Sequence, residues 1–278
     1  MSSYLLNSAN IKPDQWGSPA DIQYAVKENA GRIYGINPDN IALAMPMWEM
    51  AGNRAYGQSK NNIVGAIGTS LKWQANGLKG GATYDDANNI IDCGTIIDPR
   101  TWSGITIIYS GNMIDQAAYP SICTNMLSEA YYGNFNFSYE SSYIINWRPG
   151  NNESALSYSL GVSTRRMIAV TWIKNSTAKI YVNGQEKASG DKTNGWLASN
   201  YTTQINGYYR GAWRTSSLHY NFLNIFSVAL TANQVASMYD RPWGLYEPVS
   251  RPVYFFQAAV GGLSIPVARH HYQHNIRI

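Results

Sequence analysis

The chain has 278 residues, of which 45% are hydrophobic and 14% charged, with 21 Tyr, 9 Trp and 24 Gly. This length suits one all-β domain with terminal segments, and the composition excludes a wholly disordered chain. The formal net charge of +4 arises from 21 basic and 17 acidic residues, an excess too small to indicate a nucleic-acid-binding domain.

The first 40 residues form a predicted N-terminal arm with one short helix. Ser18 is a suitable N-cap, Pro19 suits the first helical position, and Asp21 lies in the first turn. Gly31 is expected to end the helix after about three turns. A helix of that length is marginal alone, so it needs a surface to pack on.

From Ile41 to about residue 227 the pattern changes to alternation with a period of two. About a dozen short β-like runs recur between Gly, Asn and Asp residues, without alternating helices, which predicts an antiparallel sandwich. The expected strands include residues 62–67, 70–73, 89–93, 104–110, 134–139, 142–147, 155–160, 167–173, 178–184 and 223–230.

The stretch "AVTWIKNSTAKIYVNGQ", residues 169–185, is the clearest of these runs. Ile168, Val170 and Trp172 alternate with Met167, Ala169 and Thr171, so the two sets face opposite sides of a sheet. Asn183-Gly184 favours the positive φ angles of a tight hairpin turn. The stretch therefore predicts a meander of antiparallel strands.

A second helix is predicted to begin after Thr231. The Thr231 hydroxyl suits an N-cap, Gln234 completes a capping box, and Pro242 ends the helical run. Val235 and Met238 are its expected core-facing residues.

The order of these motifs resembles a known family. It comprises the "AVTW" strand, a turn, the "YVNG" strand and "NFLNIFSVALTANQVASMYD" (221–240), preceded by "IALAMPMWEMAGNRAYGQSKNNIVGAI" (41–67) and "LKWQANGLKGGATYDDANNIID" (71–92). This series is similar to the laminin-G-like, concanavalin A-like lectin and glucanase jelly rolls. The resemblance implies an all-β antiparallel jelly-roll sandwich over residues 41–256, followed by a basic tail at 257–278.

Within that family, "MYDRPWGLYEPVSRPVYFF" (238–256) looks like the ending of members encoded by bacteriophages, which implies a place in a virion. Two departures argue against a calcium site of the family type. Asn221 and Phe222 stand where an acidic pair is often found, and Arg166 and Met167 stand in place of the usual Trp-His. No metal or cofactor is therefore expected.

Catalysis finds little support in the sequence. Glycoside hydrolysis needs two converging carboxylates, yet no two of the 17 acidic residues are separated by two or by four positions, the spacings that share a strand face. There is no G-x-S-x-G turn or phosphate-binding glycine loop. His219 is expected to be structural, and the histidines of the tail lack the acidic or cysteine neighbours typical of a metal site. We expect a protein without enzymatic activity.

Aromatic residues in turn-rich segments are the candidate ligand-binding groups. Tyr208, Tyr209 and Trp213 lie in "YYRGAWR", and Tyr131 and Tyr132 lie in "YYG". Exposed aromatic rings stack on sugar rings or anchor protein interfaces. Both ligand classes, a glycan and a protein partner, stay open.

The C-terminal tail is the candidate docking segment, because no acidic residue follows Glu247. Its candidate docking residues are Arg251, Arg269, His270, His274 and Arg277. The other sequence signals concern the compartment: Cys93 and Cys123 are expected to be free thiols, and no signal peptide or membrane-spanning run is expected.

The preferred hypothesis is a non-enzymatic bacteriophage virion structural protein that decorates the capsid surface and docks through its terminal segments. Its expected partners are other virion proteins, the major capsid protein or a tail component, with several copies on the particle and no direct contact with nucleic acid or membrane. Assembly would take place in the host cytoplasm. The alternatives are a host-glycan-binding adhesin of a tail fibre or spike, and a polysaccharide hydrolase or lyase.

Overall fold

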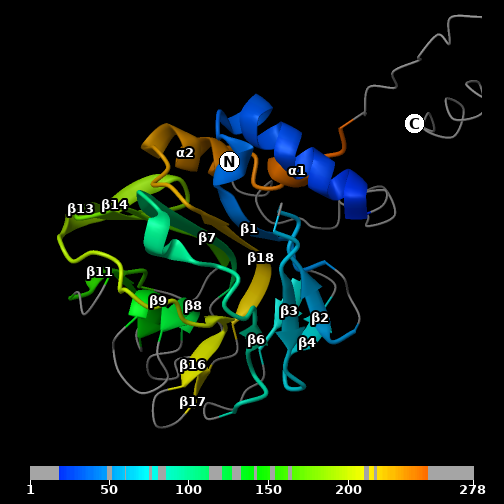
Figure 1. Cartoon of the computed structure of the whole chain (residues 1–278), viewed down its shortest axis with the longest axis horizontal. Helices are drawn as coiled ribbons and strands as arrows, with labels where there is room; N and C mark the ends of the chain where they lie inside the picture. Colours follow the sequence, from blue (N-terminus) through cyan, green and yellow to red (C-terminus); the bar gives the residue numbers. More distant parts are fainter. Residues whose placement is uncertain are drawn as a thin grey trace, which may run out of the picture.

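Two antiparallel sheets packed face to face form the body of the protein, and a layer of helices covers one of them (Figure 1). The computed structural model describes residues 19–48, 52–59, 61–74, 77–80, 86–112, 121–126, 133–140, 143–150, 154–161, 165–209, 213–215 and 218–249. The predicted all-β antiparallel sandwich is confirmed.

Sheet A is eight-stranded, with the order β14-β13-β12-β7-β18-β5-β4 and with β1 also paired to β18. Its strands are β1 (Ile41–Met45), β4 (Lys72–Gln74), β5 (Gly77–Lys79), β7 (Gly104–Asn112), β12 (Arg165–Ile173), β13 (Ser176–Val182), β14 (Gln185–Lys192) and β18 (His219–Phe226).

Sheet B is also eight-stranded, with the order β11-β10-β9-β8-β15-β6-β3-β2. Its strands are β2 (Arg54–Tyr56), β3 (Val64–Ile67), β6 (Ile91–Asp92), β8 (Ser121–Met126), β9 (Gly133–Glu140), β10 (Ile144–Pro149), β11 (Leu156–Ser159) and β15 (Thr203–Ile205). A separate two-stranded ribbon consists of β16 (Gly207–Tyr209) and β17 (Trp213–Thr215).

The main core lies between the two sheets and confirms the alternation predicted for β12. Ile168, Val170 and Trp172 are fully buried in it. The indole Nε1 of Trp172 donates to the Lys192 carbonyl at 3.0 Å. Because the indole N–H is paired in this way, the large ring is buried in the core without leaving a hydrogen-bond donor unpaired.

The predicted tight turn between β13 and β14 is also confirmed. Asn183 and Gly184 have φ angles of 52° and 77°, the two positive values that a type I′ hairpin requires. The meander β12-β13-β14 follows directly in the sheet order.

The N-terminal helix α1 (Pro19–Tyr34) packs on the outer face of sheet A, as Figure 1 shows. Val26, Ala30 and Tyr34 bury their side chains in a second apolar cluster with Ile108 of β7. The helix continues three residues beyond Gly31, because burial of Tyr34 offsets the weak helix propensity of that glycine. Residues 19–34 of the predicted arm are thus held against the sandwich.

The second helix α2 (Ala232–Asp240) confirms the predicted capping box. The Thr231 hydroxyl accepts from the Gln234 backbone N–H, and the Gln234 side chain accepts from the Thr231 backbone N–H. Val235 and Met238 are buried, as expected. The helix ends at Asp240, before Pro242.

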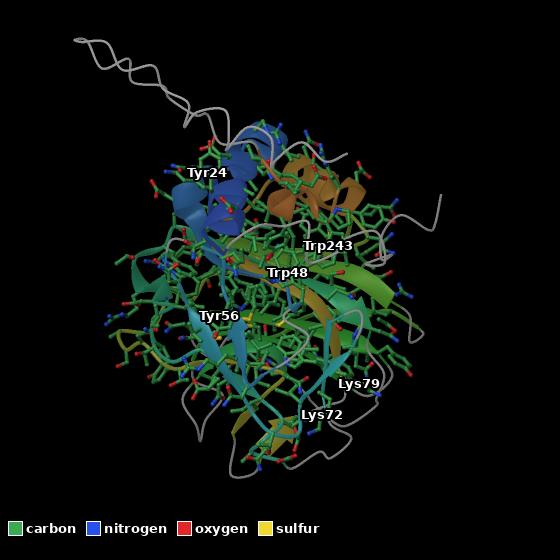
Figure 2. All side chains as sticks on the ribbon, turned by 90° about the vertical axis from the view of Figure 1, so that its right-hand side faces the viewer. Tyr24, Trp48, Tyr56, Lys72, Lys79 and Trp243 are labelled. Atoms are coloured by element: carbon green, nitrogen blue, oxygen red, sulfur yellow. The ribbon has the colours of Figure 1, made fainter. Side chains whose placement is uncertain are left out.

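Short 3-10 helices complete the described part: η3 (Pro38–Asn40), η4 (Pro99–Thr101) and η5 (Gly244–Tyr246). An aromatic cluster fastens η5 to sheet A. The rings of Trp48 and Trp243 stack with centroids 6.3 Å apart, and Trp243 meets Phe222 of β18 edge-on at 5.3 Å. Figure 2 shows Trp48 and Trp243 side by side just below the helices, and Lys72 and Lys79 near the bottom of the same view.

Cys93 and Cys123 are free and buried in the main core, which confirms the prediction of free thiols. Burial raises the pKa of the Cys93 thiol to about 12 and also raises that of Cys123, to which the neighbouring Cys93 adds. Both groups are therefore protonated and unreactive at neutral pH.

Candidate functional site

The outer faces of the two sheets differ in chemistry. The helices cover the outer face of sheet A with apolar side chains, whereas the outer face of sheet B carries hydroxyl and amide groups. Ser121, Ser138, Asn146 and Ser157 lie opposite one another across β8, β9, β10 and β11. We call these four residues the polar row.

The polar row follows from strict alternation along β9. Phe135, Phe137 and Tyr139 point into the main core, so Asn136 and Ser138 between them face outward. An outward Asn or Ser would ordinarily meet solvent, yet Asn136 and Ser138 are 4% and 3% exposed.

Hydrogen bonds within the polar row and to the neighbouring Asn136 leave one donor of the row unused. The Ser157 hydroxyl donates to Asn146 Oδ1 at 2.6 Å, and the Ser121 hydroxyl donates to Asn136 Oδ1 at 3.1 Å. The Nδ2 of Asn146 is buried and has no acceptor among the described residues. Leaving such a group unpaired costs about 1–3 kcal/mol, so an acceptor from a bound molecule would stabilise it.

A second register row adds positive charge beside the first. Thr124 of β8 lies opposite Asn136, and Asn136 lies opposite Arg148 of β10. The half-buried Arg148 thus stands two residues along its strand from Asn146, on the same face.

Three of the predicted aromatic residues lie on the ribbon β16–β17 at one end of the polar row. Ile205 of β15 pairs with Cys123, the Asn206 N–H donates to the Ile122 carbonyl at 3.2 Å, and β16 continues along β8 toward Ser121. Within the ribbon, Tyr209 lies opposite Trp213, and Tyr208 lies opposite Arg214. The structure therefore brings Tyr208, Tyr209 and Trp213 into one short hairpin.

The other predicted site residues fall outside the described residues. These are the aromatic pair Tyr131 and Tyr132 and the docking residues Arg251, Arg269, His270, His274 and Arg277.

The polar row was not among the residues selected from the sequence. A signal for it was present in "NFNFSY", where Asn or Ser recurs at every second position between aromatic residues, and in "SYIINW", where Asn146 stands between Ile145 and Trp147. Such alternation predicts an outward face, but it does not reveal that the face is buried or which strands adjoin it.

Two carboxylates whose pKa values are lowered lie away from the polar row. Hydrogen bonding from Ser70 lowers the pKa of Asp86, and hydrogen bonding from Arg100 lowers that of Asp98. Both carboxylates are surface turn residues, and neither belongs to the polar row. Lowered pKa values favour the ionised form, which a general acid cannot use.

Across the described ranges, no three His, Cys, Asp or Glu side chains gather in a way that would hold a metal ion. The same residues contain no helix that is both long and apolar enough to span a membrane.

Comparison with known proteins gives structural neighbours but no sequence relatives. The sequence matches no family model and no curated protein. Trypanosoma rangeli sialidase in complex with sialic acid aligns with a TM-score of 0.61 at 11% identity, over 78% of this chain and 37% of that chain.

Two structures of the binding domain of botulinum neurotoxin DC are also similar. The complex with SialylT has a TM-score of 0.56 at 10% identity, and the complex with rat synaptotagmin II has a TM-score of 0.57 at 11% identity. Each alignment covers 73% of this chain and 52% of the toxin domain.

The chain therefore spans about half or less of these neighbours' own length. At such low identity the likeness shows the fold alone, a β-sandwich.

Proposed function

We propose that the protein is a carbohydrate-recognition β-sandwich without catalytic activity, which binds a glycan on the outer face of sheet B. The observation that carries the proposal is the unpartnered Nδ2 of Asn146 in a row of hydroxyl and amide groups. The adjoining ribbon carries Tyr208, Tyr209 and Trp213.

Sugar chemistry suits this combination of groups. A sugar hydroxyl both accepts and donates, so it can accept from Asn146 Nδ2 while donating to a neighbouring oxygen. Aromatic residues bind the apolar C–H face of a pyranose ring. Each neutral hydrogen bond adds about 0.5–1.5 kcal/mol net, so one sugar would bind with a millimolar dissociation constant, about −4 kcal/mol.

The structural neighbours suggest which glycan to test first. They include a sialidase in complex with sialic acid and a toxin binding domain in complex with SialylT. Sialic acid carries a carboxylate, and Arg148 beside the polar row supplies the complementary guanidinium. We therefore favour sialylated glycans over neutral ones.

Absence of catalysis is part of the same proposal. The polar row contains Ser and Asn but no carboxylate, so it has no group that could act as the general acid in cleavage of a glycosidic bond. Incubation with sialyllactose should release no free sialic acid.

A glycan array with purified protein tests the proposal. Wild type should bind sialylated glycans, and Asn146→Ala and Trp213→Ala should each weaken binding about tenfold, the loss expected from one hydrogen bond or one stacked ring. Ser189→Ala, on β14 of sheet A, serves as the control and should bind as wild type does. Unchanged binding by Asn146→Ala would refute the site.

As the setting for this activity we propose the surface of a bacteriophage particle. The support is the resemblance of residues 238–256 to the ending of phage-encoded members and the acid-free segment after Glu247. In this role the protein is a structural component assembled in the host cytoplasm, present in several copies and attached to the major capsid protein or to a tail component.

Deleting residues 1–18 and 257–278 tests the setting, because both segments lie outside the described residues and belong to the proposed docking ends. The truncated protein should fold with wild-type stability but should fail to join particles in a complementation assay. Normal incorporation of the truncated protein would refute docking through the ends.

A further inference from the structure

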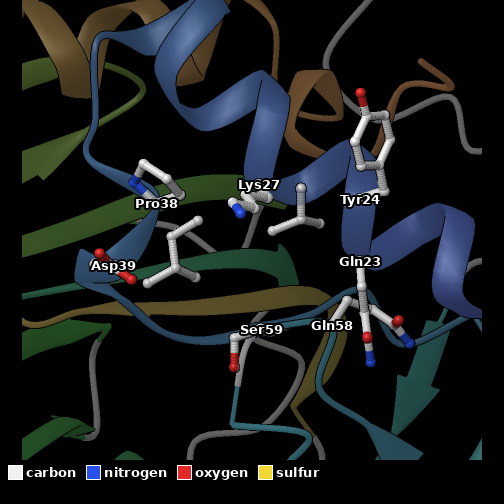
Figure 3. Close-up of a pocket in the computed structure, with 9 residues that line it drawn as sticks. Gln23, Tyr24, Lys27, Pro38, Asp39, Gln58 and Ser59 are labelled. Atoms are coloured by element: carbon white, nitrogen blue, oxygen red, sulfur yellow. The ribbon is translucent and has the colours of Figure 1, made fainter. Parts of the chain in front are cut away.

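A cavity separate from the polar row lies beside helix α1. It has a volume of about 300 Å³, at the small end of the range for small-molecule sites. Figure 3 shows Gln23 of α1 and Gln58 together on one side of it, with Pro38 and Asp39 of η3 on the opposite side.

One wall of the cavity, the segment 57–59, is hydrogen-bonded to β1. The Gln58 backbone N–H donates to the Ala44 carbonyl at 2.6 Å, and the Ser59 hydroxyl donates to the Ala42 carbonyl at 3.0 Å. Gln23 Nε2 of α1 donates to Asn62 Oδ1 at 2.5 Å. The helix, the segment and β1 are therefore tied together around the cavity.

Gln58 supplies an unused acceptor on that wall. The residue is 5% exposed, and its Oε1 has no hydrogen-bond donor among the described residues. Its Nε2 donates weakly to the Tyr56 carbonyl at 3.4 Å. Exchanging Oε1 and Nε2 of Gln58 would place its amide oxygen against the carbonyl oxygen of Tyr56, which is unfavourable. The unpaired atom is therefore Oε1, and a ligand must supply a hydrogen-bond donor to it.

The remaining lining determines the class of ligand. Val26 and Ile41, both buried, form an apolar base. Lys27 and Asp39 are exposed members of the lining with opposite charges, so the site has no net charge that would favour an ion. A neutral ligand with hydroxyl groups and a partly apolar ring fits the unpaired acceptor of Gln58, the apolar base and the balanced charges of the lining.

We propose that this cavity binds one neutral, hydroxyl-bearing ring of monosaccharide size, with a hydroxyl donating to Gln58 Oε1. The site is formed by α1, η3, the start of β1 and the segment with Gln58 and Ser59, and it is distinct from the polar row on sheet B. It does not depend on glycan binding at Asn146, and either site can exist without the other.

Ligand-observed NMR with D-glucose, D-galactose and N-acetyl-D-glucosamine tests the proposal on the full chain. Wild type should show saturable, millimolar binding of at least one of them. Gln58→Leu should weaken that binding at least tenfold, the equivalent of one hydrogen bond. Asn146→Ala, in the polar row, should leave it unchanged.

Thermal unfolding of the ligand-free variants separates loss of a site from loss of the fold. Removing an unpaired buried acceptor does not reduce stability, so Gln58→Leu should melt no lower than wild type. If Gln58→Leu fails to fold, Gln58→Met, which keeps the side-chain length, replaces it. Absence of sugar binding by wild type, or equal binding by the folded Gln58 variant, would overturn the proposal and leave the cavity to water.

Discussion

The two buried thiols should make the protein sensitive to alkaline pH in a range where few other groups titrate. Burial raises the pKa of Cys93 from its ordinary value of 9.0 to about 12, and it raises the pKa of Cys123 in the same direction. The difference between these two pKa values of Cys93 corresponds to a loss of about 4 kcal/mol of unfolding free energy once the pH exceeds both. A typical domain is stabilised by only about 5–15 kcal/mol.

The direction of the effect follows from the protons bound in each state. Below pH 9 both thiols are protonated in the folded and the unfolded chain, so their full contribution to stability is present. Above pH 9 the unfolded chain releases these protons while the folded chain keeps them, so stability falls as pH rises toward the folded pKa. The slope should be about 1.4 kcal/mol per pH unit for each thiol.

Urea unfolding at pH 8, 9, 9.5 and 10 measures this slope, and the range ends where tyrosine begins to ionise. Wild type should lose stability from pH 9 upward, and the double variant Cys93→Ala, Cys123→Ala should lose markedly less. At pH 8 the double variant should be about 1–3 kcal/mol less stable because of lost packing. Parallel pH profiles of the two proteins would refute the assignment to the thiols.

Three further substitutions test the packing of the helical layer, each by urea or thermal unfolding. Thr231→Ala should cost about 1 kcal/mol, because it removes the capping box with Gln234. Gly184→Ala should cost about 1–3 kcal/mol, because its φ is 77° and an added Cβ would lie 2.9 Å from Cβ of Tyr239. Val26→Ala should cost about 2 kcal/mol, because it leaves a gap between α1 and sheet A.

Matched controls separate these mechanisms from general effects of alanine. Asn233→Ala, on the exposed side of α2, should change stability by less than about 0.5 kcal/mol. Gly161 has a φ of 78° with nothing within 4 Å of an added Cβ, so Gly161→Ala isolates the backbone strain. Val64→Ala, at a valine 38% exposed, is the control for Val26. Equal costs for a substitution and its control would contradict the corresponding mechanism.

Sequence reasoning succeeded where the structure depends on neighbours in the chain. The alternation along residues 167–173 and the Asn183-Gly184 turn predicted the hairpin, and Thr231 with Gln234 predicted the start of α2. The predicted end of helix α1 at Gly31 was wrong, because the helix continues to Tyr34. Helix propensity is a local property, whereas the burial of Tyr34 against η5 and sheet A depends on distant residues.

The candidate sites were harder to predict because their parts come from distant segments. Asn146 joins Ser121 and Ser138 through strand registers that only the folded sheet sets, and Gln58 meets Gln23 across a cavity between a helix and a loop. Of the aromatic residues chosen from the sequence, Tyr208, Tyr209 and Trp213 lie on one hairpin because they are close in the chain, and Tyr131 and Tyr132 lie outside the described residues.

By itself the sequence predicted both helices, most of the long strands and the faces that their side chains take, because alternation, capping and turn formation act over a few residues; it did not indicate β8. The tertiary structure decided the order of the strands, the covering of one sheet by helices, and the burial that leaves Asn146 and Gln58 with unpaired polar atoms. These features depend on contacts between residues far apart in the chain, which local patterns do not encode.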